Sequence, residues 1–133
     1  MSILDEIRRY RAETWRWQRL MGRPLTLRLR RSVAVESPAH WAGLRDAWKM
    51  RAERARRRAK HPPHLQAWRC IHRYEGSWRD PGAPYYGGLQ MDLSFQRAYG
   101  PRLLRSKGTA NRWTPLEQMW TAERALRAGR GFY

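Results

Sequence analysis

The chain has 133 residues, with 28 Lys and Arg against 11 Asp and Glu, so its formal net charge is +17. This length suits one domain, or one small domain with an extension. The charge predicts a polyanionic partner, namely an acidic cell-wall polymer, a nucleic acid or an anionic lipid surface. No apolar run approaches the length of a membrane span. Residues 1–15 lack the order of a positive and then an apolar segment that marks a secretory signal.

The single Cys70 excludes an internal disulfide, and we expect it to be buried as a small apolar side chain. Three histidines, His61, His64 and His72, lie near it in the sequence. Their spacing, H-x2-H-x5-C-x-H, is not a standard zinc pattern. We therefore expect neither a metal nor a cofactor.

Residues 1–60 are predicted to form a basic helical region, with 17 basic and 6 acidic side chains. Ser2 is suited to begin a first helix, and Gly22 with Pro24 to end it. The residues of its predicted inner face recur at steps of four and three along the sequence: Ile3, Ile7, Tyr10, Thr14, Trp17 and Met21. Polar residues then alternate with leucines over residues 25–30, which permits a short strand.

A second helix is expected from Ser37-Pro38, a favourable cap and first turn, to Pro62-Pro63, which stop it. Its second half, residues 49–60, reads KMRAERARRRAK. This run is more typical of a solvated helix face than of a nucleic-acid-binding surface. Zinc-finger spacing, a heptad zipper and an RNA-binding aromatic motif are all missing from the sequence.

Residues 64–75, HLQAWRCIHRYE, predict a helix whose apolar face ends in a carboxylate, because Leu65, Trp68 and Glu75 share one side. One interpretation is that Glu75 pairs with Arg73 or Arg79, or is simply exposed at the helix end. The other is that Glu75 lies partly dehydrated at the edge of a cleft. Dehydration favours the protonated form, which could donate a proton to a leaving oxygen.

The segment after this helix has the composition of a saccharide groove, although a tyrosine-rich hairpin has it too. Gly76 lets the helix stop, and Trp78 is placed to cover a cleft edge. Residues 85–90 read YYGGLQ. Aromatic faces stack on sugar rings, glycines allow close approach to the backbone, and the Gln90 amide can bond hydroxyl or N-acetyl groups.

Two further helix starts are expected. Asp92 is placed to cap the helix DLSFQRAY, and residues 114–117, TPLE, form a capping box. Glu117 and Gln118 are open to two interpretations, capping and surface roles or contact with a ligand.

From Trp68 to Gly129 the chain resembles the lysozyme-like catalytic domain of bacterial resuscitation-promoting factors and soluble lytic transglycosylases. The matching motifs are W-x6-E-G-S-W at 68–78, YYGGLQ at 85–90, AYG at 98–100 and EQMWTAERAL at 117–126. The resemblance implies a small, mainly α-helical domain over residues 61–133, with a short β-turn or hairpin at its cleft. It also implies cleavage of peptidoglycan between N-acetylmuramic acid and N-acetylglucosamine, at the cell wall or outside the cell.

The same resemblance implies roles for single residues. Glu75 takes the place of the catalytic glutamate, and the substrate-binding positions fall on Trp78, Tyr85, Tyr86, Gln90 and Gln118. In lytic transglycosylases one glutamate protonates the glycosidic oxygen and then takes a proton from the sugar's own C6 hydroxyl. The other nearby carboxylates, Asp80 and Asp92, have expected structural roles, which favours this mechanism over a hydrolase with two carboxylates.

The chain departs from the family at three places. Tyr74 stands where a cysteine often precedes the glutamate, Phe95-Gln96 stand where Thr-Trp is usual, and the sequence stops at residues 131–133 before the usual Trp-Pro ending. Two other functions stay open, a non-catalytic glycan-binding protein and a basic nucleic-acid-binding protein. Residues 61–133 are few for a self-sufficient core, so we expect the helices of residues 1–60 to pack on them.

Overall fold

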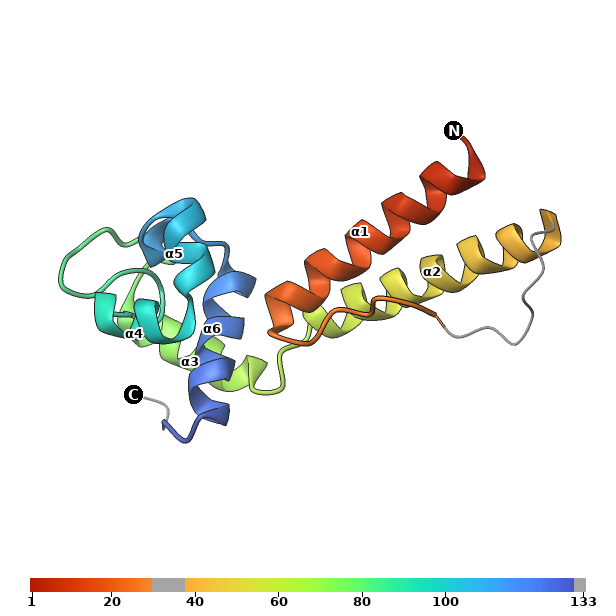
Figure 1. The fold of residues 1–133 in the computed structure, drawn as a ribbon. Helices are drawn as coiled ribbons and strands as arrows, with labels where there is room; N and C mark the ends of the chain where they lie inside the picture. Colours follow the sequence, from red (N-terminus) through yellow and green to blue (C-terminus); the bar gives the residue numbers. More distant parts are fainter. Residues whose placement is uncertain (30–37, 131–133) are drawn as a thin grey trace. The chain divides into compact units, whose positions relative to one another are not determined.

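The computed structural model describes residues 1–29 and 38–130, and it is mainly helical, as predicted (Figure 1). The lysozyme-like identity of the fold stays a prediction. The chain divides into two compact units, Met1–Lys60 and His61–Tyr133. Among the described helices, none combines the length and the apolar character needed to cross a membrane. The elements are α1 (Ile3–Met21), α2 (Pro38–Ala59), α3 (Leu65–Glu75), α4 (Leu93–Tyr99), α5 (Pro101–Lys107), the 3-10 helix η1 (Ala110–Arg112) and α6 (Pro115–Arg127).

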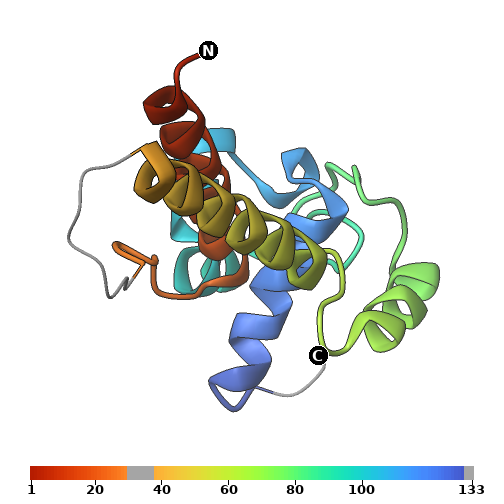
Figure 2. The same ribbon diagram turned by 90° about the vertical axis from the view of Figure 1, so that its right-hand side faces the viewer.

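The first unit is a pair of long helices that lie side by side and run in the same direction (Figures 1 and 2). The hydroxyl of Ser2 caps α1, and Gly22 ends it with a left-handed φ of 69°, as the sequence predicts. Glu6 pairs with Arg45 at 3.3 Å, which joins the first halves of the two helices. The buried residues follow steps of three and four in both helices: Ile7, Thr14, Gln18 and Met21 in α1, and Trp48, Ala52, Ala55 and Ala59 in α2.

The short strand expected after α1 does not form, and the described part of the chain contains no strand. The N–H of Thr26 donates to Gln18 Oε1 at 2.9 Å, and its carbonyl accepts from Trp15 Nε1 at 2.6 Å. Side chains of α1 therefore satisfy the backbone groups that a neighbouring strand would have satisfied. The predicted cap Ser37 lies outside the described residues.

The second unit has its own core, formed by Trp68, Met91, Ala110, Trp113, Met119 and Ala122. Helix α6 fixes the start of α3 through Glu123, whose side chain is buried. Glu123 accepts the backbone N–H of His64 at 2.9 Å and lies 2.6 Å from the Nδ1 of the same residue. The helix that ends at Glu75 is thereby anchored at its other end.

Both predicted helix caps of this unit are confirmed. Asp92 accepts the N–H of Phe95 at 2.7 Å at the start of α4, and Thr114 with Glu117 forms a capping box on α6. The expected hairpin is not shown. Tyr86 and Met91 form only an isolated antiparallel bridge, with reciprocal backbone bonds of 3.0 and 2.9 Å. The packing of residues 1–60 on residues 61–133 stays a prediction.

Candidate functional site

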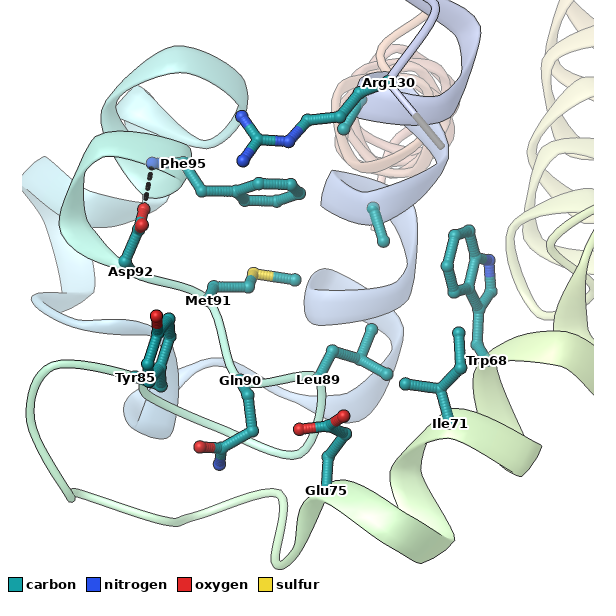
Figure 3. Close-up of a pocket in the computed structure, with 12 residues that line it drawn as sticks. Trp68, Ile71, Glu75, Tyr85, Leu89, Gln90, Met91, Asp92, Phe95 and Arg130 are labelled. Atoms are coloured by element: carbon teal, nitrogen blue, oxygen red, sulfur yellow. Dashed lines mark hydrogen bonds between the residues drawn. The ribbon is translucent and has the colours of Figure 1, made fainter. Parts of the chain in front are cut away.

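A pocket of about 380 Å³ lies in the second unit, where α3, the turn before α4, and the end of α6 contribute side chains (Figure 3). Its apolar lining includes Trp68, Ile71, Leu89, Met91 and Phe95. Three residues predicted for the site, Glu75, Tyr85 and Gln90, line this same pocket. The structure therefore brings together a carboxylate, an aromatic ring and an amide beside an apolar surface.

Glu75 is the last residue of α3, and its carboxylate lies at the pocket edge (Figure 3). The side chain is exposed to solvent. Within the described residues it forms no ion pair or hydrogen bond, so the alternative of pairing with Arg73 or Arg79 does not hold. Partial dehydration is not found, whereas the remaining interpretation, exposure at the helix end, is. Glu75 is an uncommitted carboxylate that water reaches.

Tyr85 and Gln90 differ in how firmly they are held. Tyr85 is 50% exposed, and its ring is open to a ligand. Gln90 Nε2 donates to Asp80 Oδ2 at 2.9 Å and to the carbonyl of Gly87 at 2.8 Å. The amide nitrogen of Gln90 is thus committed to the turn, while its side-chain oxygen has no partner in the described part of the chain.

Trp78 and Tyr86 do not line the pocket but pack against the buried core. The Trp78 ring stacks on His72, with 4.1 Å between ring centroids and an angle of 18° between the planes. Both side chains are half-buried, and the ligand contact predicted for them stays a prediction.

Gln118 is fully buried, which does not fit the direct ligand contact predicted for it. Its Oε1 accepts the N–H of Gly88 at 2.9 Å. Its Nε2 donates to the carbonyls of Trp78 at 2.8 Å and Trp113 at 3.1 Å. One amide of α6 therefore holds the YYGGLQ turn in place, and Gln118 is a positioning residue.

The two glycines of this turn are required because neighbouring side chains lie too close to the backbone for a Cβ. Gly87 has a φ of +77°, and a Cβ there would collide with the Gln118 amide. A Cβ on Gly88 would lie 2.6 Å from both His72 Nδ1 and a carbon of the Trp78 ring. Only residues without a side chain let the turn reach its anchors.

The two aspartates near Glu75 are occupied by local hydrogen bonds. Asp80 Oδ1 accepts the N–H of Gly82 at 2.9 Å, and Asp80 Oδ2 accepts from Gln90. Asp92 caps α4, as described above. Their expected structural roles are confirmed, and Glu75 is left as the carboxylate of the pocket without such a role.

The sequence did not single out Arg130, which lines the opposite part of the pocket above Phe95 (Figure 3). Its Cζ lies 5.1 Å from the centre of the Phe95 ring. No pattern in the sequence connects Arg130 with the other pocket residues.

The residues weighed as metal ligands lie apart. No three His, Cys, Asp or Glu side chains within the described ranges gather into a group that could hold a metal ion. His64 contacts Glu123, and His72 stacks on Trp78. Cys70 is exposed, so the expectation that it is buried is wrong. It lies two residues after Trp68, which turns it about 200° away from the buried side of α3.

Comparison of the chain with protein-family models, with curated proteins and with solved structures finds no match.

Proposed function

We propose that the protein cleaves the glycan strand of peptidoglycan at the bond between N-acetylmuramic acid and N-acetylglucosamine, with Glu75 as the single catalytic carboxylate. The observation that carries the proposal is the contrast among three carboxylates. Asp80 and Asp92 are occupied by hydrogen bonds, whereas Glu75 lines the pocket beside Tyr85 with its carboxylate uncommitted. The resemblance of residues 68–129 to lysozyme-like lytic transglycosylases gives the same residue the same role.

In the proposed reaction a saccharide lies along the apolar lining with one ring against Tyr85. The bound sugar excludes water from Glu75. Glu75 then donates its proton to the glycosidic oxygen as the bond to C1 of the muramic acid breaks. The C6 hydroxyl oxygen bonds to C1 and gives its proton to Glu75, so the acid is regenerated and a 1,6-anhydro sugar is formed.

Digestion of purified peptidoglycan, with products identified by mass spectrometry, tests the proposal. We expect anhydro-muropeptides from the native protein and at least about a 100-fold lower rate from Glu75→Gln, since general acid catalysis contributes about 10²–10⁴-fold. Glu53→Gln, on the exposed side of α2, is the matched control and should retain full activity.

Other products would change the assignment. Reducing-end sugars would indicate a hydrolase, and Asp80→Asn and Asp92→Asn would then identify its second carboxylate. If natively folded protein yields no products yet still binds the glycan, the non-catalytic alternative replaces the enzyme. Equal rates for native protein and Glu75→Gln would remove Glu75 from the reaction.

We further propose that α2 attaches the protein to an anionic wall polymer. Residues 1–60 carry a net charge of +11, from 17 basic and 6 acidic side chains. The second half of α2 exposes Arg54, Arg56 and Arg58, while its alanines face inward, and the exposed Lys60 follows directly after the helix. Arginines four residues apart repel each other along the helix, and a bound polyanion relieves that repulsion.

A further inference from the structure

The end of the pocket at Phe95 and Arg130 has no part in the proposed proton transfers. Arg130 is nevertheless held in place there. The backbone N–H of Arg130 donates to the carbonyl of Ala125 at 3.1 Å, and the backbone N–H of Gly129 donates to the carbonyl of Leu126 at 3.0 Å. With Gly129 at a φ of +90°, these two bonds form the Schellman motif that ends α6. The helix end thus fixes the backbone from which the Arg130 side chain extends over the Phe95 ring.

The charge of Arg130 has no counter-ion in the described part of the chain. Its side chain forms no ion pair or hydrogen bond there, and its one described interaction is with the face of Phe95. Asp92, the nearest carboxylate in sequence to that ring, is engaged by the Phe95 N–H. A guanidinium over the face of an aromatic ring makes no hydrogen bond to that ring, so its N–H donors can bind a carboxylate with two parallel bonds.

Figure 3 places Arg130 and Glu75 at opposite ends of the apolar lining, with Leu89, Met91 and Phe95 between them. A ligand lying along this surface reaches both charged groups at once. The part of the ligand near Glu75 must carry the bond to be cleaved. The part near Arg130 lies against the positive charge of the guanidinium. The ligand that suits both ends is a saccharide with an acidic substituent.

We propose that Phe95 and Arg130 form a subsite for a carboxylate carried by the bound saccharide, which makes the pocket selective for an acidic amino sugar over its neutral counterpart. This inference rests on the proposed function. The two sugars of peptidoglycan differ in one group, because N-acetylmuramic acid carries a lactyl ether, whose carboxylate is free where no peptide stem is attached, and N-acetylglucosamine does not.

The test compares two tetrasaccharides by calorimetric titration in the Glu75→Gln background, where turnover is suppressed. One is built of N-acetylglucosamine alone, and the other alternates it with N-acetylmuramic acid whose lactyl carboxylate is free. We expect the acidic tetrasaccharide to bind about tenfold more tightly, as a charge-assisted pair contributes. Adding Arg130→Gln should bring this ratio near one, and Arg130→Lys should restore part of it.

The control is Arg105→Gln, which removes the same charge from an exposed position on α5 outside the pocket. This variant should keep the tenfold ratio. A ratio that Arg130→Gln leaves unchanged overturns the subsite, as does an equal loss in the Arg105→Gln control. If the subsite is overturned but the unmodified protein still cuts peptidoglycan, only the subsite proposal fails and the proposed function stands. If neither tetrasaccharide binds and peptidoglycan stays intact, the proposed function fails with it.

Discussion

The side-chain oxygen of Gln118 accepts the backbone N–H of Gly88 at 2.9 Å across thirty residues of sequence. Replacing Gln118 by leucine keeps the approximate volume but leaves three groups without a partner, the Gly88 N–H and the carbonyls of Trp78 and Trp113. We expect the free energy of unfolding to fall by about 3 kcal/mol, because each unsatisfied buried group costs about 1–3 kcal/mol and the site can relax in part. Urea denaturation followed by circular dichroism measures the change.

Gln66→Leu supplies the comparison, since Gln66 is an exposed glutamine on α3. Its effect should stay within about 0.5 kcal/mol. If both leucine variants unfolded at the same urea concentration, Gln118 would not anchor the turn.

The glycines of the turn give a second prediction. Gly87→Ala and Gly88→Ala should each destabilise the second unit by about 2–4 kcal/mol, since the new methyl group collides with the Gln118 amide or with the His72–Trp78 stack. Gly129 shares the positive φ of Gly87, but a Cβ at Gly129 would have no atom within 4 Å. Gly129→Ala should therefore cost only the backbone strain of about 1–2 kcal/mol. Thermal unfolding of the three variants checks this order, and a Gly129 variant as unstable as the other two would refute the collision.

The exposed charges of α2 give a third prediction, on binding to purified poly(glycerol phosphate). Affinity should fall steeply with salt, because counter-ions released from the polymer drive the association. Replacing Arg54, Arg56, Arg58 and Lys60 by glutamine should make the slope of log affinity against log salt shallower. The expected change is about 0.7 for each phosphate that the variant no longer neutralises.

The charge-matched control replaces Arg97, Arg102, Arg105 and Arg112 of the second unit, all of which are exposed. It should change the slope less. Equal slopes for the two variants would mean that the total charge of the chain, not α2, controls binding. A clear preference for duplex DNA over the wall polymer would contradict the wall assignment and support the nucleic-acid alternative.

Local rules predicted the helices of this chain well. Ser2, Asp92 and the Thr114–Glu117 box all begin helices as expected, since a cap depends on a few adjacent residues. The prediction of a strand after α1 was wrong because of tertiary hydrogen bonds. Thr26 is bonded by Gln18 and Trp15 of the preceding helix, and leucine alternation gives no sign of such partners.

The candidate site was predictable in part. The motif YYGGLQ and the helix-ending Glu75 identified the region, and the structure brings Glu75, Tyr85 and Gln90 into one pocket. The other predicted site residues, Trp78, Tyr86 and Gln118, do not line this pocket. Gln118 reads as a polar surface residue on α6, and only the fold shows that the turn folds back onto it. Arg130 lies forty residues after Gln90 in sequence, so no local pattern could connect them.

The anchoring of the turn by α6 divides the pocket into positions that are free to vary and positions that are not. Gly87, Gly88 and Gln118 are constrained by the stability of the unit, so selection for folding alone is enough to preserve them. The side chains of Tyr85, Glu75 and Arg130 are exposed, and a change there costs the fold little. A new ligand preference can therefore evolve at the pocket rim, or be engineered there, on a scaffold that stays intact.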